Sequence, residues 1–218
     1  MKRISYVIWD WNGTLLDDVR AACGAFNTLL VRRGIPTLSL EHYREIFGFP
    51  VRDFYRSAGI KLELEDWDRL AAEYHELYLA DESPELADGT FALLRHWKEQ
   101  RIGQSIVTVS EQTIVDTQIQ KFGIREELDQ VIGVSNLHGA SKRDLVHGFL
   151  DSLSIPSAEV LMVGDSLHDA ELAREADTQC VLVASGHQSR SRLETTGFPV
   201  YANLAVLASA VLRQGNYL

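Results

Sequence analysis

The chain has 218 residues, of which 45% are hydrophobic and 24% are charged, enough for one domain or for one domain with a small appendage. Its formal net charge is −10 and it contains no run of lysines or arginines, which argues against a surface for nucleic acid or anionic membranes. A small phosphorylated partner remains compatible with this charge, because a metal ion or helix terminus can reverse the field in one cleft.

The N-terminal segment and the cysteines indicate the compartment. Too few apolar residues precede Asp10 for a secretory signal, and no window approaches the length of a transmembrane helix. Cys23 and Cys180 lie far apart in the sequence, and we expect both to be reduced and buried. These features predict a soluble, cytoplasmic protein.

The first predicted strand, "YVIWD" (residues 6–10), is short and apolar and ends in Asp10, as expected of a strand buried on both faces. From Asp18 to about Ala87 we find no strand signal, only helical patterns. They cover residues 19–34, 39–48, 51–59 and 64–80. This stretch is too long for a crossover helix, so we predict a helical subdomain over residues 18–87.

Beyond residue 87 apolar runs alternate with helical patterns. The predicted strands are 104–110, 130–136, 159–166 and 180–186, and the predicted helices are 89–100, 111–123, 141–155, 167–177 and 203–215. This alternation predicts an α/β fold, a doubly wound parallel sheet formed by residues 1–17 and 88–218.

Polar residues follow several of these strands. The first strand ends at Asp10, the second carries Thr108 and Ser110, and the fourth leads into "GDSLHD" (164–169), while Lys142 precedes the intervening helix. Ligands of open α/β sheets bind beyond the carboxyl ends of the strands. Oxygen ligands favour Mg²⁺ and a lysine favours phosphate oxygens, so the set suits a phosphoryl group with a divalent cation.

"DWNGTLLD" (10–17), Thr108, Lys142 and "GDSLHD" together resemble the haloacid dehalogenase superfamily over essentially the whole chain. The helical subdomain resembles the small helical cap of its phosphoglycolate-phosphatase-like branch, a similarity of fold and motif order only. The resemblance implies a Rossmann-like core, and an Mg²⁺-dependent phosphatase that acts on a small phosphorylated metabolite through an aspartyl-phosphate. We expect a monomer or homodimer.

The resemblance also implies residue roles. Asp10 is the nucleophile, and the metal set is Asp10, the backbone carbonyl of Asn12, Asp165 and Asp169. The phosphoryl oxygens are bound by Thr108, Lys142 and the backbone N–H groups near Gly13 and Thr14, with Ser110 as the alternative hydroxyl. Arg143 follows Lys142 where related enzymes often have proline.

Asn12 occupies the position at which family phosphatases carry an acid–base aspartate. Its amide cannot exchange a proton near neutral pH, a loss worth about 10²–10⁴-fold in rate. Three hypotheses follow: a slow phosphatase or one that recruits His168 or His187, a reaction whose leaving group needs no proton, and a phosphate binder without turnover. We rank the hydrolase first, and a surface position is the simpler expectation for either histidine alone.

Two further segments are candidates for substrate contacts. Arg52 and Arg56 share a helix face beside Tyr55, where they either meet an anionic group of the substrate or lie in solvent. The polar stretch 185–197 either contacts a phosphate or partner, or begins a solvent-facing helix.

Overall fold

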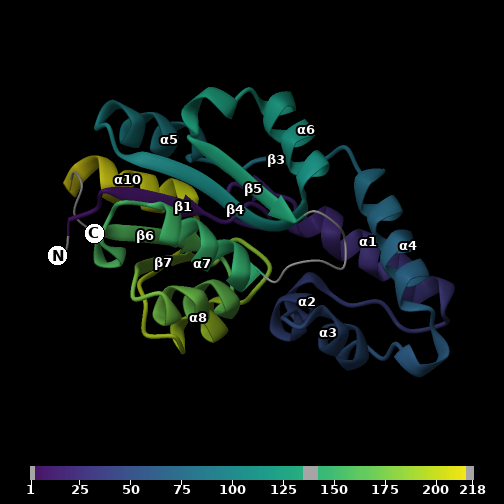
Figure 1. Ribbon diagram of the computed structural model, residues 1–218. Helices are drawn as coiled ribbons and strands as arrows, with labels where there is room; N and C mark the ends of the chain where they lie inside the picture. The colour runs from purple at the N-terminus through teal and green to yellow at the C-terminus, as the bar shows by residue number, and fades with distance from the viewer. Residues whose placement is uncertain (1–2, 135–141, 215–218) are drawn as a thin grey trace.

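The computed structural model describes residues 3–134 and 142–214. Its main sheet has six parallel strands in the order β5-β4-β1-β6-β7-β8 (Figure 1). Their bounds are β1 Tyr6–Trp9, β4 Gly103–Glu111, β5 Gln130–Val134, β6 Val160–Gly164, β7 Gln179–Val183 and β8 Val200–Tyr201. The chain adds strands on one side of β1 up to β5 and then crosses to the other side, so the strand order reverses beside β1.

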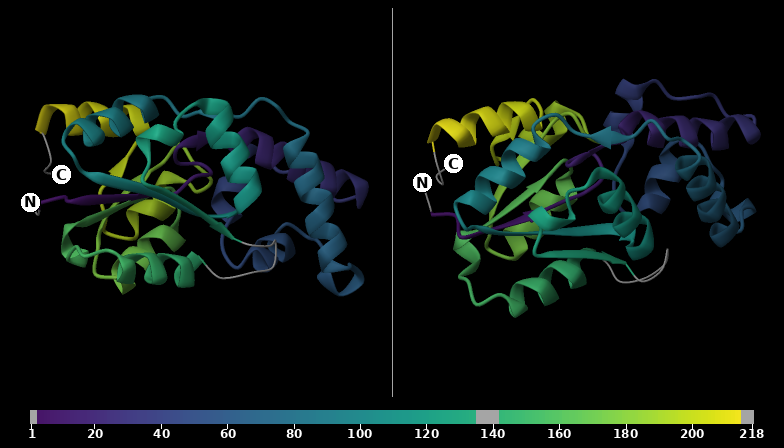
Figure 2. Two further views of the ribbon diagram at one scale, coloured as in Figure 1. Left: turned by 45° about the horizontal axis from the view of Figure 1, so that its top comes forward. Right: turned by 90° about the horizontal axis from the view of Figure 1, so that it is seen from above.

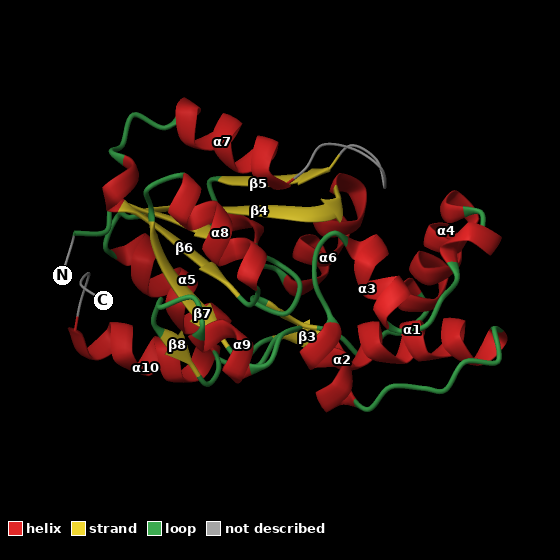
Figure 3. Cartoon of the chain, turned by 90° about the horizontal axis from the view of Figure 1, so that it is seen from below, coloured by secondary structure: helices red, strands yellow, loops and turns green. Residues whose placement is uncertain are grey.

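Helices cover both faces of this sheet, as Figures 2 and 3 show. One face carries α5 (Thr90–Glu99), α6 (Gln112–Phe122) and α10 (Leu204–Gln214). The other carries α7 (Lys142–Ser152), α8 (Leu167–Glu175) and the short α9 (Arg190–Glu194). None of the described helices is both long and apolar enough to cross a bilayer.

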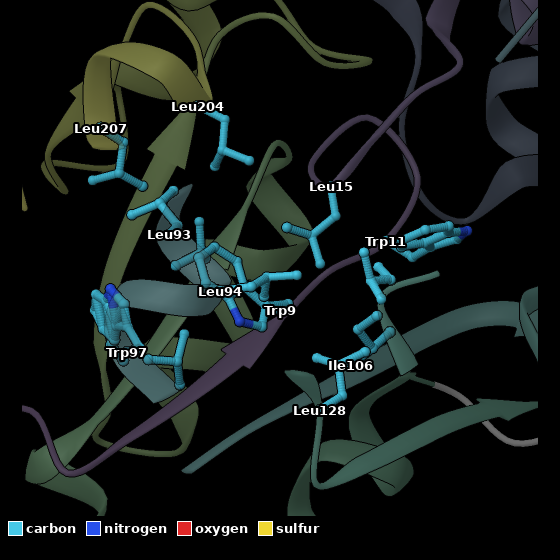
Figure 4. Close-up of a cluster of buried hydrophobic side chains, with 14 of the residues drawn as sticks. Trp9, Trp11, Leu15, Leu93, Leu94, Trp97, Ile106, Leu128, Leu204 and Leu207 are labelled. Carbon is cyan, nitrogen blue, oxygen red and sulfur yellow. The ribbon is translucent and has the colours of Figure 1, made fainter. Parts of the chain in front are cut away.

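Alternate residues of β1 supply the two halves of the core. Val7 and Trp9 pack on the α5 side, where the ring of Trp9 lies 6.3 Å from that of Trp97 (Figure 4). Tyr6 and Ile8 pack on the α7 side. A strand apolar on both faces has no solvent-facing residue, which explains its unbroken apolar run.

Four α-helices that lie between β1 and α5 in the chain form what we call the helical insert. They are α1 (Val19–Arg32), α2 (Leu40–Ile46), α3 (Val51–Ser57) and α4 (Trp67–Leu79). The insert lies beyond the carboxyl ends of the strands (Figures 1 and 2). Its own core is rich in aromatic side chains, with Phe26 4.4 Å from Phe54 and 4.9 Å from Tyr55 between ring centroids.

The predicted fold class is confirmed, whereas the expectation of no strand between residues 18 and 87 is wrong. The two-residue strands β2 (Leu16–Asp17) and β3 (Glu85–Leu86) pair antiparallel where the chain enters and leaves the insert. Such short strands have no periodicity to recognise. Residues 135–136 of the third predicted strand and residue 141 of the following helix lie outside the described residues. The domain boundary at residues 17 and 87 stays a prediction.

Candidate active site

Three buried carboxylates gather beyond the ends of β1 and β6. Asp10 follows β1, Asp165 follows β6 and Asp169 lies in the first turn of α8. One oxygen from each lies within 4.8 Å of the others. Because β1 and β6 are parallel neighbours at the point where the strand order reverses, their ends deliver both acids to one crevice.

Lys142, the first residue of α7, joins two of these acids. Its ammonium donates hydrogen bonds to Asp10 and, at 2.6 Å, to Oδ1 of Asp169. Burial alone would lower the pKa of Lys142, but the charges of Asp10 and Asp169 outweigh burial and raise it, so the lysine stays charged. The sequence-predicted residues Asp10, Lys142, Asp165 and Asp169 are thus brought together.

Asp169 is the most completely satisfied of the three acids. Its Oδ2 accepts from the Ser166 hydroxyl at 2.6 Å and from the backbone N–H groups of Asp165 and Ser166. Burial alone would raise the pKa of Asp169. Lys142 and the Ser166 hydroxyl outweigh burial, so the pKa lies below the ordinary value. The carboxylate therefore fixes Lys142 and the turn before α8.

The other two acids are compensated only in part, Asp10 by Lys142 and Asp165 by His187. Burial raises the pKa of Asp10 to about 6, because Lys142 offsets only part of the desolvation. Burial raises the pKa of Asp165 to about 8, and the negative charges of Asp10 and Asp169 add to the effect. Asp10 and Asp165 are hard oxygen donors that are difficult to ionise without a nearby cation. Such a donor set fits Mg²⁺.

Two glycines make room for Asp165. A Cβ on Gly13 would lie 2.5 Å from Oδ2 of Asp165, and one on Gly186 would lie 2.1 Å from the same atom. Gly13 also has φ +73°, a backbone conformation that disfavours side chains. Any larger residue at either position would displace the carboxylate.

The side chain of Asn12 is held by three groups. Its Nδ2 donates to Oδ2 of Asp18 at 2.7 Å and lies 3.0 Å from the Tyr78 hydroxyl, while its Oδ1 accepts from the Ser110 hydroxyl at 2.5 Å. An aspartate here would place two carboxylates in direct contact. The amide at position 12 is thus matched to the acid at position 18.

Asp18 is the main site residue that sequence reasoning missed. It is 2% exposed, accepts from the backbone N–H of Gly13 at 2.8 Å and from the Tyr78 hydroxyl at 2.7 Å, and lies 3.3 Å from Nε2 of His187. The available signal was weak: a second acid in "LLDD", directly before an apolar first turn of helix. Asp17 is the exposed member of that pair.

His187 is buried, so the expectation of a surface histidine is wrong for it. Burial alone would lower the pKa of His187, but the charge and hydrogen bond of Asp18 raise it to about 9. Its Nδ1 lies 3.0 Å from the Tyr43 hydroxyl of the insert, and its backbone N–H donates to Asp165. The Asp18–His187 pair therefore connects the acidic cluster to the insert.

The predicted phosphoryl-binding groups fall into two sets: hydroxyls that line the cavity, and backbone N–H groups that already have acceptors within the protein. Thr108 and Ser110 both line the cavity above the carboxylates, and the Thr108 hydroxyl accepts from the Ser110 N–H at 3.1 Å. The N–H of Gly13 is donated to Leu16 and Asp18, and that of Thr14 to Trp11. The Thr14 hydroxyl donates to Asp10 at 3.4 Å.

The remaining candidates, His168, Arg52 and Arg56, are not among the residues that line the cavity. His168 lies 5.1 Å from the Phe49 ring, and burial lowers its pKa. Arg52 stacks over Trp67 at 4.5 Å, and Arg56 pairs with Asp53 at 2.7 Å. Neither arginine lines the cavity.

The polar stretch 185–197 joins the core to the insert. Arg44 of α2 donates to the carbonyl of Gly186 at 2.9 Å and to that of Ser185 at 2.6 Å. In return, Arg192 donates to the Phe47 carbonyl at 2.5 Å and Gln188 donates to it at 3.0 Å. These reciprocal bonds hold the end of α2 against the loop that carries His187.

A cavity of about 360 Å³ extends from the carboxylates into the insert. Its floor is formed by core residues, including Asp10, Asp165, Asp169 and Lys142, and its wall by aromatic residues of the insert. The volume lies in the range of small-molecule sites, so the arrangement can bind a small ligand beside a carboxylate cluster that could hold a metal ion.

The chain is similar to known proteins in sequence and in fold. A phosphoglycolate phosphatase of Caulobacter vibrioides is 26% identical over 199 residues, covering 88% of this chain and 83% of that protein. An N-acetylmuramic acid 6-phosphate phosphatase of Pseudomonas putida is 26% identical over 190 residues, covering 85% of each. A haloacid dehalogenase-like hydrolase structure from Streptococcus pneumoniae superposes with a TM-score of 0.79 at 20% identity, covering 95% of this chain and 98% of that one. The haloacid dehalogenase-like hydrolase family matches residues 7–183, most of the chain, and the protein therefore belongs to that family.

Proposed function

We propose that the protein is an Mg²⁺-dependent phosphatase that acts on a small phosphomonoester through an aspartyl-phosphate on Asp10. The observation that carries the proposal is the contact of Asp10 with Lys142 inside the acidic cluster, at the floor of a cavity of ligand size. The phosphatase names of the two relatives support the same reaction class.

Asp10, the backbone carbonyl of Asn12 and Asp165 would hold the Mg²⁺, which supplies positive charge to bring a carboxylate and a phosphate dianion together. An Asp10 oxygen then bonds to phosphorus as the P–O bond to the leaving group breaks. Water attacks the same phosphorus in the second step, which releases inorganic phosphate and restores the carboxylate. Lys142 and the hydroxyl of Thr108, whose hydrogen is not donated to another described residue, bind the phosphoryl oxygens in both steps.

The leaving oxygen needs a proton that Asn12 cannot give. We propose that turnover therefore depends strongly on the leaving group, being fastest for acyl phosphates and slowest for alkyl esters. The helical insert would act as a cap that closes over the substrate, since Tyr43 and Tyr78 reach the Asp18–His187 pair from the insert.

Phosphate release is measured with Mg²⁺ on acetyl phosphate and on esters of graded leaving-group pKa. Asp10→Asn should lower turnover by about 10⁴-fold or more, whereas Asp17→Asn, an exposed neighbour, should not change it. A covalent beryllofluoride adduct on Asp10 would support the intermediate. If no substrate releases phosphate while phosphate analogues still bind tightly, the protein is a binder and the proposal is wrong.

The role of position 12 is tested by exchange of the amide of Asn12 and the acid of Asp18. Asn12→Asp alone places a carboxyl 2.7 Å from Asp18, so its benefit should be partial. The double variant Asn12→Asp/Asp18→Asn keeps one acid and one amide in contact. We expect it to raise turnover of alkyl esters by about 10²-fold and to leave acetyl phosphate unchanged. An equal effect on both substrates would contradict the assignment.

A further inference from the structure

The wall of the cavity is aromatic. Nine of its lining residues are Phe, Tyr or Trp, among them Phe26, Phe47, Phe54, Tyr55, Trp67 and Tyr74 of the insert. Burial raises the pKa of both Tyr55 and Tyr74 above the ordinary value, so this part of the cavity is a poor medium for charge.

The side chains with basic nitrogens that line the cavity, among the described residues, already have hydrogen-bond partners. Lys142 binds Asp10 and Asp169, and His187 binds Asp18. Nδ1 of His75 donates to the carbonyl of Ala71 at 2.8 Å, because a carbonyl only accepts. No arginine is among the described lining residues, and Glu111 adds a further acid.

Three arginines of the insert make contacts other than with the cavity. Arg33 binds Glu65 at 2.7 Å and Glu73 at 2.8 Å, and Arg44 binds the loop that precedes α9. Arg52 lies over the ring of Trp67. A carboxylate on the leaving group of the substrate would therefore enter an aromatic wall in which, among the described residues, no arginine and no free lysine lies to receive it, which is costly.

The size of the cavity limits the ligand. A volume of about 360 Å³ holds roughly a dozen water molecules at liquid density. That is enough for a phosphoryl group and one ring-sized group. Aromatic walls select such a ring by stacking and by exclusion of water.

We propose that the substrate is a phosphomonoester whose leaving group is uncharged and carries one aromatic or aliphatic ring, and that carboxylate-bearing esters such as phosphoglycolate are poor substrates. This inference rests on the proposed phosphatase function and adds to it the chemistry of the leaving group.

The test compares benzyl phosphate with 2-phosphoglycolate, because both are esters of a primary alcohol and their leaving groups make a similar demand for a proton. We expect kcat/KM to favour benzyl phosphate by about 10–100-fold, the effect of one unpaired charge. Cyclohexylmethyl phosphate should behave like benzyl phosphate. A preference for 2-phosphoglycolate would overturn the inference.

Two matched variants place an added cation inside and outside the cavity. His75→Arg should raise kcat/KM for 2-phosphoglycolate relative to benzyl phosphate by about tenfold. His42→Arg makes the same change at an exposed position of α2 and should leave the ratio unchanged. Equal responses of the two variants would show that the wall does not select charge.

Acetyl phosphate and ligand binding separate the two proposals. If acetyl phosphate is hydrolysed but ring-bearing esters are not preferred, the inference fails and the phosphatase stands. If nothing is hydrolysed, calorimetric binding of benzyl phosphate and 2-phosphoglycolate to the Asp10→Asn variant with Mg²⁺ still tests the cavity. Tighter binding of 2-phosphoglycolate there would also overturn the inference.

Discussion

The floor and the wall of the cavity are stabilised by different forces. On the floor, buried Asp10, Asp169 and Lys142 hold one another by charge, and Asp165 is left with a raised pKa. On the wall, Phe26, Phe54 and their neighbours pack ring against ring. The floor should therefore respond to pH and to metal ions, whereas the wall should respond to the size and shape of its side chains.

We therefore expect the floor to govern the chemical step and the wall to govern substrate selectivity. Phosphoryl transfer needs fixed charges at fixed places, so it limits the floor to a few residue types. An apolar wall tolerates many combinations of side chains of similar total volume. Relatives can thus keep one floor and present different walls.

The largest effect is expected from Lys142→Met. Removal of the ammonium leaves Asp10 and Asp169 as unpaired buried acids, and we expect the free energy of unfolding to fall by about 3–5 kcal/mol. Saturating Mg²⁺ should restore part of this loss, because the ion neutralises the same acids. Urea unfolding with and without Mg²⁺ measures both.

The matched change on the wall is Phe54→Ala, which removes a 4%-exposed ring. It should cost a comparable amount, about 3–5 kcal/mol, that Mg²⁺ does not restore. Equal recovery of both variants by Mg²⁺ would contradict the distinction between floor and wall.

The next effect concerns the pH dependence of stability through His187. Its pKa is raised from 6.5 to about 9, so the stabilisation is fully present below pH 6.5 and is lost as pH rises to about 9. We expect roughly 3 kcal/mol, measured as the difference between wild type and His187→Gln in metal-free urea unfolding from pH 6 to 10.

His42→Gln is the control for this experiment, because His42 is exposed. It should follow the wild-type curve. A His187→Gln curve parallel to wild type over the whole range would show that the histidine is not charged in the folded protein.

Metal binding should depend on pH through the floor. The pKa values of about 6 for Asp10 and about 8 for Asp165 mean that Mg²⁺ displaces protons near neutrality. Mg²⁺ affinity should rise by up to about tenfold per pH unit between pH 6 and 8, and calorimetry in two buffers should detect the released proton. Affinity that is constant over this range would place the ion elsewhere.

The smallest effect is expected at the contact between the polar stretch 185–197 and the insert. Arg192→Ala removes the bonds to the Arg44 and Phe47 carbonyls and should cost about 1 kcal/mol, with a few-fold rise in KM for ring-bearing esters. Arg190→Ala breaks an exposed pair with Glu194 on α9 itself and should cost less than about 0.5 kcal/mol. Equal losses would show that the bonds between loop and insert add nothing.

The fold class and four members of the floor, Asp10, Lys142, Asp165 and Asp169, could be predicted from the sequence alone. These residues follow buried strands or begin helices, and a parallel sheet brings the carboxyl ends of neighbouring strands together whatever the loops do. The apolar runs and helical periods therefore located them without any knowledge of distant contacts.

The residues around that floor come together through contacts between distant segments, which the sequence does not reveal. Asp18 lies 169 positions before His187, and Tyr78 lies 66 positions after Asn12, so no local pattern could pair them. The same holds for the aromatic wall, whose rings have helical spacing like any core residue and line the cavity only because the insert lies beyond the carboxyl ends of the strands. Charge pairing and cavity shape are properties of packing between distant segments, and for that reason the match between the Asn12 amide and the Asp18 carboxylate is visible only in three dimensions.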